Sequence, residues 1–486
     1  MKKIYPILFS AILLLNACIS DDGNYDYTPL KEVTIEGVAD SYRFILQEHQ
    51  TITPKITTEL TADNLAYCWR IGNDTLATSP VLDYTFTNVL ASKDPLTFEV
   101  IDLSTNVRYA KRMEIAVVSP FQSGWMIFSV LNNAACLSFQ SYEDKLSLYE
   151  DVYQEVNGEA LSGSPLMVKQ LRYQDGSTGA YKDRISVLCK DGKSAELDGS
   201  SLLRVKYYED EFRPGGLQLQ NINAEYYGND YSLFMIHKGK IYSKLTGSMG
   251  TPEDAYYQYP LEGDAKDYQI GAYFTKPHSD YYVTLDELNH RYVYFNRSSL
   301  STIVSSLSVD EASSTRDFDP NNVKGTSVWM GQSKDQKALS IVKTPEGKYV
   351  LDVMTSTYAG IFTLVARYEF PDGAVNNESC FAPHRNIPYL MIGTGNQLKA
   401  LNLEALSAGA GALNNIATYE GRIAAMQYAY DINKNIDEFG IAITGSNTER
   451  TGSLLIINPT LTAGGEILKR YDHVGGKIIS ICRKIM

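Results

Sequence analysis

The fold is decided by the stretch Trp125-Met126-Ile127-Phe128-Ser129, which is followed by Asn132-Asn133 and by an apolar run from Ala135 to Phe139. Two short apolar runs that flank a polar turn are typical of a β-hairpin. The same pattern recurs along the chain, so the hairpin is the repeating unit of a larger structure. Its seven copies occupy residues 125–139, 185–197, 232–244, 281–295, 338–354, 389–403 and 441–457.

The spacing of these copies predicts how they assemble. From Trp125 to Ile441 the chain covers 316 residues in six intervals, about 53 residues per copy. This is close to the ~50-residue period of kelch-type propeller blades. A hairpin unit cannot cover its apolar face alone, so neighbouring units are expected to stack around an axis. The final run, Lys477 to Cys482, has no partner of its own and is expected to complete the first blade. We therefore predict an all-β fold in which residues 121–486 form a seven-bladed β-propeller, with six or eight blades as alternatives.

A separate β-sandwich is predicted upstream, over residues 31–119. Short alternating runs such as Tyr67–Ile71 and Leu96–Val100 are separated by turn clusters, which indicates an immunoglobulin-like sandwich. Trp69 is expected to pack between its two sheets. Pro120 marks the end of the segment, because proline discourages continuation of a strand.

The N-terminus has the features of an export signal. Lys2 and Lys3 precede an apolar segment, Ile4 to Leu15, that is too short to span a bilayer. The segment ends in Leu15-Asn16-Ala17-Cys18, which resembles a bacterial lipobox. Residues 1–17 are therefore predicted to be a lipoprotein signal peptide, and Cys18 is predicted to carry the lipid that anchors the protein without a spanning helix. The alternative is an ordinary secretory signal with an incidental cysteine.

Residues 18–30 are predicted to form a lipidated acidic tether. Asp21, Asp22 and Asp26 follow the cysteine closely, and this run resembles the surface-export signal of Bacteroidetes lipoproteins. That resemblance implies an outer-membrane location facing the cell exterior. A solvated, flexible tether is the simpler alternative.

Taken together, the arrangement resembles the PKD-like family of Bacteroidetes lipoproteins. The resemblance is carried by the lipobox, the acidic tether and two stretches of the sandwich, Tyr67-Cys68-Trp69 and Phe98 to Asp102, followed by a long β domain. Such proteins tend to be encoded with outer-membrane uptake systems similar to the starch-utilisation system. The resemblance therefore implies a role in nutrient capture, with an outer-membrane transporter complex as partner and a glycan or peptide as ligand.

Composition narrows the classes of partner and site. The formal net charge is −13, which excludes nucleic acid and anionic lipid as partners because both demand basic patches. Apart from Cys18 the five cysteines are scattered and include no C-x-x-C pair, so neither a disulfide framework nor a zinc site is predicted. A single disulfide is left open.

No catalytic motif occurs in the chain. A nucleophile elbow, a G-x-G-x-x-G loop and an H-E-x-x-H helix are all absent from the sequence. Among the six scattered histidines, His278 and His290 flank one predicted hairpin and form an alternative metal or acid–base pair. We predict a non-enzymatic binding or accessory protein and name no catalytic residue. The alternative is an extracellular propeller hydrolase or lyase that acts on a polymer.

Aromatic side chains supply the candidate ligand-binding residues. Tyrosine is abundant, with 35 residues against 16 phenylalanines, and its ring offers an amphipathic contact surface. The alternative for each of these residues is ordinary packing. The residues selected as candidates for stacking on sugars are Trp125, Trp329, Tyr226, Tyr227, Tyr281 and Tyr282.

One spacing resembles a calcium loop. Asp431, Asn433, Asn435 and Asp437 place oxygen-bearing side chains at alternate positions. The sixth position is not glycine and the twelfth is Ala442, so the segment is not an EF-hand. It is a weak candidate for Ca²⁺, with a polar loop as the alternative, and no other cofactor is expected.

Overall fold

The computed structural model describes residues 30–485 apart from 88, 91–93, 143–146, 175–180, 213–221, 228–231, 246–256, 258–259, 265–266, 278–280, 297–302, 307, 310–317, 359–360, 432–434 and 459. The predicted signal peptide, Cys18 and all but the end of the predicted tether lie outside these residues. The chain divides into two compact units, Met1–Val117 and Val118–Met486. No helix in the described ranges is both long enough and apolar enough to cross a bilayer.

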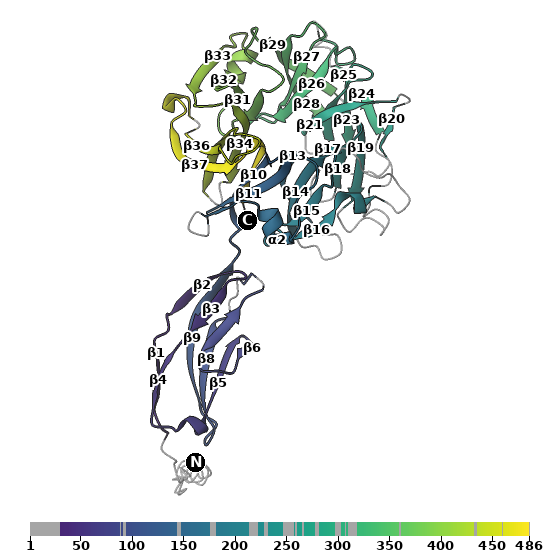
Figure 1. Cartoon of the computed structure of the whole chain (residues 1–486). Helices are drawn as coiled ribbons and strands as arrows, with labels where there is room; N and C mark the ends of the chain where they lie inside the picture. The colour runs from purple at the N-terminus through teal and green to yellow at the C-terminus, as the bar shows by residue number, and fades with distance from the viewer. Residues whose placement is uncertain are drawn as a thin grey trace, which may run out of the picture. The chain divides into compact units, whose positions relative to one another are not determined.

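The first unit is a β-sandwich. A five-stranded sheet has the order β2-β9-β8-β5-β6, and two-stranded sheets are formed by β1 with β4 and by β3 with β7 (Figure 1). Trp69 is fully buried, and its ring centroid lies 4.4 Å from that of Phe98. The predicted position of Trp69 between the sheets is therefore confirmed. The elements are β1 (Val33–Glu36), β2 (Ser41–Ile45), β3 (His49–Ile52), β4 (Lys55–Thr58), η1 (Ala62–Asn64), β5 (Leu65–Ile71), β6 (Asp74–Ala77), β7 (Leu82–Thr85), β8 (Leu96–Asp102) and β9 (Arg108–Val118).

The second unit contains seven sheets within the described residues, which we call blades 1 to 7 (Figure 1). In each blade two adjacent strands coincide with the hairpin predicted from the sequence. Blade 1 contains β10 (Ser123–Leu131), β11 (Ala134–Ser141), β12 (Leu148–Tyr149) and β38 (Lys477–Ile485); blade 2 contains β13 (Ser164–Gln174), β14 (Tyr181–Lys190), β15 (Ala195–Asp198) and β16 (Arg204–Tyr207); blade 3 contains β17 (Ile222–Tyr227), β18 (Ser232–His237) and β19 (Lys240–Leu245).

Blades 4 and 5 each have five strands, and blades 6 and 7 have four. In the described residues of the second unit, two short α-helices and two 3₁₀-helices lie between strands, and they are α2 (Val152–Asn157), η2 (Tyr208–Glu211), α3 (Leu403–Ser407) and η5 (Leu461–Ala463). Blade 4 contains β20 (Glu262–Gly263), β21 (Ile270–Thr275), β22 (Tyr281–Asp286), β23 (Arg291–Asn296) and β24 (Ile303–Ser306); blade 5 contains β25 (Ser308–Val309), β26 (Thr326–Gln332), β27 (Ala338–Lys343), β28 (Tyr349–Tyr358) and β29 (Ile361–Glu369). Blade 6 contains β30 (Cys380–Pro383), β31 (Tyr389–Thr394), β32 (Gln397–Asn402) and β33 (Leu413–Thr418); blade 7 contains β34 (Ile423–Asp431), β35 (Ile436–Ile443), β36 (Gly452–Ile457) and β37 (Ile467–Gly475).

The blades form a ring through their inner strands. The strands β38, β13, β17, β21, β26, β30 and β34 contact one another in this order, and β34 contacts β38 again. The strand β38 pairs antiparallel with β10, from Ser123↔Ile485 to Val130↔Lys477. The prediction of a propeller whose last strand completes the first blade is therefore confirmed, and the ring has seven blades.

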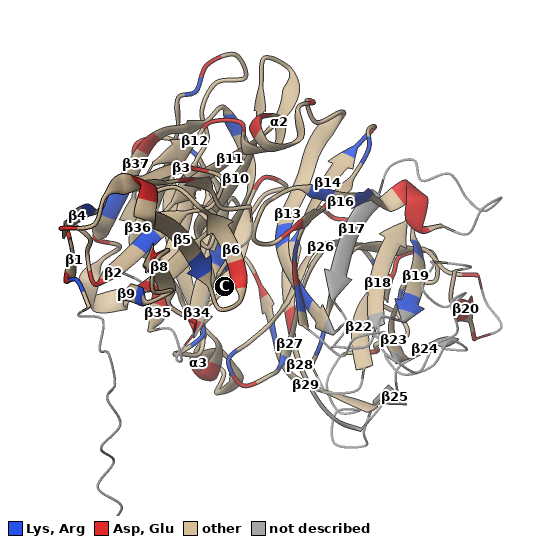
Figure 2. Cartoon of the chain, turned by 90° about the horizontal axis from the view of Figure 1, so that it is seen from below, with Lys and Arg blue, Asp and Glu red and all other residues tan. Residues whose placement is uncertain are grey.

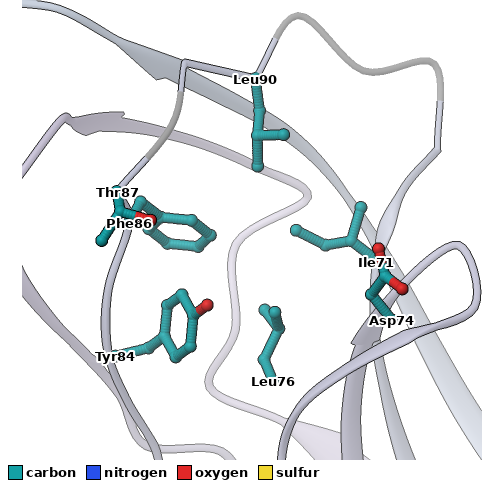
Figure 3. Close-up of a pocket in the computed structure, with 7 residues that line it drawn as sticks. All are labelled: Ile71, Asp74, Leu76, Tyr84, Phe86, Thr87 and Leu90. Atoms are coloured by element: carbon teal, nitrogen blue, oxygen red, sulfur yellow. The ribbon is translucent and has the colours of Figure 1, made fainter. Parts of the chain in front are cut away.

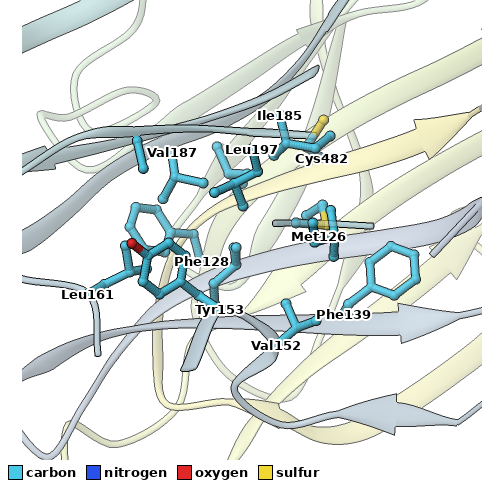
Figure 4. Close-up of a cluster of buried hydrophobic side chains, with 14 of the residues drawn as sticks. Met126, Phe128, Phe139, Val152, Tyr153, Leu161, Ile185, Val187, Leu197 and Cys482 are labelled. Carbon is cyan, nitrogen blue, oxygen red and sulfur yellow. The ribbon is translucent and has the colours of Figure 1, made fainter. Parts of the chain in front are cut away.

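Local sequence explains the first hairpin and the core beside it. Asn132 and Asn133 have φ of 51° and 60°, as a two-residue type I′ turn requires, and asparagine tolerates this left-handed conformation. The paired strands then bury their side chains against blade 2, where Phe128 of β10 and Val187 of β14 belong to one apolar cluster (Figure 4). Each such side chain stabilises the fold by ~1.5–3 kcal/mol relative to leaving it in water.

Candidate functional site

A group of polar and aromatic side chains lies where blade 6 packs on blade 7. We call it the seam cluster, and it consists of His384, Asn386, Tyr428 and Asp437. The register of β34 with β35 pairs Tyr430 with Asp437 and Tyr428 with Phe439. Because directly opposed residues point to the same face of a sheet, Tyr428, Tyr430 and Asp437 share one face of the hairpin. The turn between β30 and β31 supplies His384 and Asn386.

Hydrogen bonds join the members of the seam cluster. The side-chain amide of Asn386 donates to Asp437 Oδ2 at 3.2 Å and to the Tyr428 hydroxyl oxygen at 3.1 Å. The Tyr428 hydroxyl in turn donates to the carboxylate of Asp437. Burial raises the pKa of Tyr428, and the hydrogen bond to Asp437 and its negative charge raise that pKa further. Tyr428 is therefore a protonated donor that holds Asp437 in place.

His384 is buried and packs against Tyr428. Its ring centroid lies 4.5 Å from that of Tyr428. Its Nδ1 atom accepts the backbone N–H groups of Asn386 at 3.1 Å and of Ile387 at 3.3 Å. A ring nitrogen that accepts two N–H groups carries no proton, so this geometry favours the neutral imidazole with its hydrogen on Nε2.

The outer side of the seam cluster is accessible. Asp437 is exposed and Asn386 is half-buried, while Tyr430 beside them is 42% exposed. A carboxylate, an amide and an aromatic face therefore meet at one surface. This combination can accept and donate hydrogen bonds to a polar ligand while the Tyr430 ring contacts its apolar face.

A small pocket occurs in the sandwich, between the ends of β6 and β7. Figure 3 shows Tyr84 and Phe86 on one side of it and Ile71 on the other, and the Tyr84 and Phe86 ring centroids are 4.9 Å apart. Its volume of about 190 Å³ is below the ~300 Å³ at which small-molecule sites begin, so it suits a single side chain better than a cofactor. The pocket is lined by Ile71, Asp74, Leu76, Tyr84, Phe86, Thr87 and Leu90.

The structure supports the packing alternative for three of the six candidate stacking residues. Trp125, Tyr281 and Tyr282 are buried in the propeller, so their rings are packing residues that present no face to a ligand. Trp329 is partly buried and packs 5.5 Å from the ring centroid of Phe381. Trp125 lies on β10 and both tyrosines lie on β22, and the side chains of these strands are covered on both sides. Tyr226 and Tyr227 lie on β17, and their side chains fall outside the described residues.

The two carboxylates of the predicted calcium loop lie on opposite faces of a hairpin. Asp431 is opposed by Ile436 and Asp437 by Tyr430, so the two carboxylates point to opposite faces of the β34–β35 hairpin. Asn435 occupies the turn with φ of 52°, and Asn433 lies outside the described residues. No group of three His, Cys, Asp or Glu side chains in the described ranges is arranged to hold a metal ion. His278 also falls outside those ranges, so its pairing with His290 stays a prediction.

Several buried carboxylates hold the propeller together. Glu196 accepts the Tyr173 hydroxyl at 2.9 Å and lies 3.3 Å from Arg184 Nε. Asp352 of blade 5 accepts the Tyr292 hydroxyl of blade 4 at 3.0 Å and lies 3.2 Å from Arg367 Nε. Burial raises the pKa of Asp352 to about 6, against the lowering effect of Arg367 and Tyr292. The only sequence signal for such groups is an acid inside an apolar run, as Asp352 is within β28.

The five described cysteines, Cys68, Cys136, Cys189, Cys380 and Cys482, are all free thiols. Burial raises the pKa of the Cys189 and Cys380 thiols to about 12. These thiols are therefore protonated side chains that pack in the core.

Comparison with solved structures finds distant neighbours. A quinonprotein alcohol dehydrogenase-like protein from Bacteroides thetaiotaomicron is 12% identical, with a TM-score of 0.47 over 94% of this chain and 100% of that one. The β-propeller domain of Cps50 (Swd1) from Myceliophteria thermophila is 9% identical, with a TM-score of 0.38 over 64% of this chain and 86% of that one. The fold assignment rests on the strand pairing described above.

Comparison with families gives a match at the N-terminal side. No curated protein matches the chain. The model of the PKD-like family matches residues 18–165, a range that covers the sandwich and extends into blade 2. This match agrees with the resemblance of the sandwich to the PKD-like family that the sequence predicts.

Proposed function

We propose that this protein is an outer-membrane lipoprotein, anchored through Cys18 and facing the cell exterior, that binds a glycan or peptide for a nutrient-uptake system without degrading it. The observation that carries the proposal is the accessible side of the seam cluster. It offers Asp437, Asn386 and the exposed ring of Tyr430 on one surface. Such a surface binds a polar ligand without needing a nucleophile or a metal ion.

The chemistry of the seam cluster suits a ligand with hydroxyl groups or backbone amides. Asp437 accepts hydrogen bonds, while Asn386 can donate and accept at the same time. The Tyr430 ring can stack against the apolar face of a sugar or against an aliphatic side chain. Because Tyr428 and His384 are buried behind them, the polar groups are held in position before the ligand arrives, which reduces the entropy lost on binding.

The anchor is supported by the N-terminal residues. Leu15-Asn16-Ala17-Cys18 resembles a lipobox, and the PKD-like match begins at Cys18. A diacylated cysteine would hold the protein stably at the membrane. Replacement Cys18→Ala in the full chain should move the protein from the membrane fraction to the soluble fraction. If the variant stays with the membrane, the lipid anchor on Cys18 is ruled out.

Binding can be tested by thermal shift on the soluble form, residues 19–486, against a panel of glycans and peptides, with product analysis of each mixture. A ligand that binds the native state raises its stability by mass action, about 2.7 kcal/mol at 100 times Kd. We expect a melting-temperature increase with the ligand recovered intact. Degradation of a polymer would instead support the hydrolase or lyase alternative.

The site itself is tested by Tyr430→Ala, with Tyr181→Ala as the matched control because Tyr181 is an exposed tyrosine on β14 of blade 2. If Tyr430→Ala loses the ligand-induced increase in melting temperature and Tyr181→Ala keeps it, the result supports the seam cluster as the binding site. Equal shifts in both variants would place the binding site elsewhere.

A further inference from the structure

Residues 31–118 contain four arginines, and all four lie on the outward face of the five-stranded sheet. They are Arg43 on β2, Arg70 on β5, and Arg108 and Arg112 on β9. Figure 2 colours all lysines and arginines blue on the cartoon of the chain. The adjacent residues Phe44, Trp69 and Met113 are buried in the sandwich core. Because successive side chains alternate between faces, these arginines point away from that core. We call this surface the arginine face.

The strand register gathers the charges. Thr97 of β8 pairs with Arg112 on one side and with Arg70 on the other. Two residues further along β8, Glu99 pairs with Ala110 and with Cys68. The side chains of Thr97, Cys68 and Ala110, which are all small, therefore lie between the arginines.

One carboxylate lies beneath the arginines. Glu99 accepts hydrogen bonds from Arg70 Nη2 at 2.8 Å and from Arg108 Nη1 at 2.9 Å, and its side chain is only 5% exposed. Burial raises the pKa of Glu99, but the hydrogen bonds and charges of Arg70 and Arg108 outweigh it, so the pKa lies below its ordinary value. Glu99 is therefore ionised, and it neutralises one of the two guanidinium groups that it binds.

The solvent-exposed side of the arginine face carries positive charge that Glu99 does not neutralise. Arg108 has a 55% exposed side chain, and Arg112 is exposed. Within the described part of the chain, no ion pair of Arg112 with a carboxylate occurs. The whole chain carries a formal charge of −13, whereas this face carries four arginines against the carboxylates of Glu99 and Glu114.

We propose that the arginine face binds an anionic polysaccharide, with Arg108 and Arg112 each holding a carboxylate or sulfate group. The guanidinium fork matches the geometry of such groups. Arg108 and Arg112 are four residues apart on one strand, about 13 Å at ~3.3 Å per residue, which suits charges repeated along a polymer better than a single ion. A flexible polymer can also contact the arginine face without contacting the rest of the molecule. An anionic membrane, in contrast, would repel the acidic molecule as a whole. This site lies outside the propeller, so it goes beyond the function proposed for the seam cluster.

The test is affinity electrophoresis of residues 19–486 in native gels that contain polygalacturonate, dextran sulfate or neutral dextran. We expect retardation by both anionic polymers, none by dextran, and loss of retardation in 1 M salt, where the Debye length is about 3 Å. Arg112→Gln should weaken retardation about fivefold, which corresponds to one charge-assisted contact. Arg108→Gln/Arg112→Gln should abolish it.

The matched control is Lys31→Gln/Lys55→Gln, which removes the same charge from exposed positions away from this sheet. Retardation of the control at the wild-type level supports the proposal. An equal loss in both double variants, or no retardation of the wild type by either anionic polymer, overturns it. Binding of the wild type only to phosphatidylglycerol vesicles overturns it as well. Arg112→Gln should keep the wild-type melting temperature. Tyr430→Ala should keep the wild-type retardation, so an error in the proposal for the arginine face can be distinguished from an error in the proposal for the seam cluster.

Discussion

Gln170 on the inner strand of blade 2 and Ile485 on the closing strand exchange two hydrogen bonds. The Ile485 N–H donates to Gln170 Oε1 at 2.9 Å, and Gln170 Nε2 donates to the Ile485 carbonyl at 2.6 Å. On the other flank of β38, the Arg483 N–H donates to Gln427 Oε1 of blade 7 at 2.6 Å. Side-chain amides from both neighbouring blades therefore bind the backbone of the strand that closes the ring.

Replacing Gln170 by alanine should weaken ring closure. The change leaves the backbone groups of Ile485 without their side-chain partner, which costs ~1–3 kcal/mol. We expect that loss in the free energy of unfolding, measured by urea denaturation of residues 19–486. Gln154→Ala on the exposed side of α2 is the control and should change it by less than ~0.5 kcal/mol. Similar values for both variants would show that the two bonds do not stabilise the ring.

Asp352 should give the propeller a measurable pH dependence. Its pKa is raised from 3.8 to about 6 in the folded chain, so the folded state binds the proton more tightly than the unfolded state. The associated stability is present at low pH and is lost as pH rises from about 4 to 6, by ~3 kcal/mol in total. The stability of Asp352→Asn relative to wild type should therefore rise by that amount between pH 4 and pH 7. If the free energies of unfolding of wild type and Asp352→Asn change equally with pH, the prediction is wrong.

Gly440 cannot carry a larger side chain. A Cβ atom there would collide with the ring of Trp125, which packs across from blade 1. Gly440→Ala should therefore destabilise the propeller by ~1–3 kcal/mol through overpacking. Trp125→Leu should recover part of this loss in the double variant, although it is destabilising alone. Strictly additive effects in a double-mutant cycle would show that the two residues are not in contact.

Trp69→Ala should unfold the sandwich selectively. Removing a fully buried tryptophan costs ~3–5 kcal/mol, which is a large part of the stability of a small domain. Limited proteolysis should then cleave within residues 31–118 while residues 121–485 resist. Trp329→Ala in blade 5 is the reciprocal control. Cleavage of both units in Trp69→Ala would mean that their stabilities are coupled.

The hairpins could be predicted because their strands are covered on both sides. All six residues of β22 and of β36 are buried, and such strands give continuous apolar runs in the sequence. The inner and outer strands lack this signal. The outer strand β33 has only exposed and half-buried residues, and the inner strand β34 mixes buried, half-buried and exposed positions. Their polar residues break the pattern, so the sequence predicts two strands of each blade and, apart from the closing strand β38 of blade 1, misses the others.

The seam cluster could not be predicted from spacing. Asn386 lies 42 positions from Tyr428 and 51 from Asp437 along the chain, and only the packing of two blades brings them together. The sequence groups Asp437 with Asp431, but the register of the hairpin places these two side chains on opposite faces. The burial of Trp125 was missed for a related reason, since a tryptophan looks the same in sequence whether its ring faces a ligand or Gly440.

The pairing of β10 with β38 also constrains how the molecule is made. The Ser123–Arg483 contact spans 360 positions, so the first blade must wait for almost the whole propeller to be synthesised before its inner strand arrives. Contacts this distant in sequence slow folding. In the meantime one edge of β10 is an open template for other strands, and nascent chains that meet at that stage risk aggregation. Pairing of the stretch from Lys477 to Ile485 with β10 therefore ends the period in which nascent chains can aggregate through this open edge.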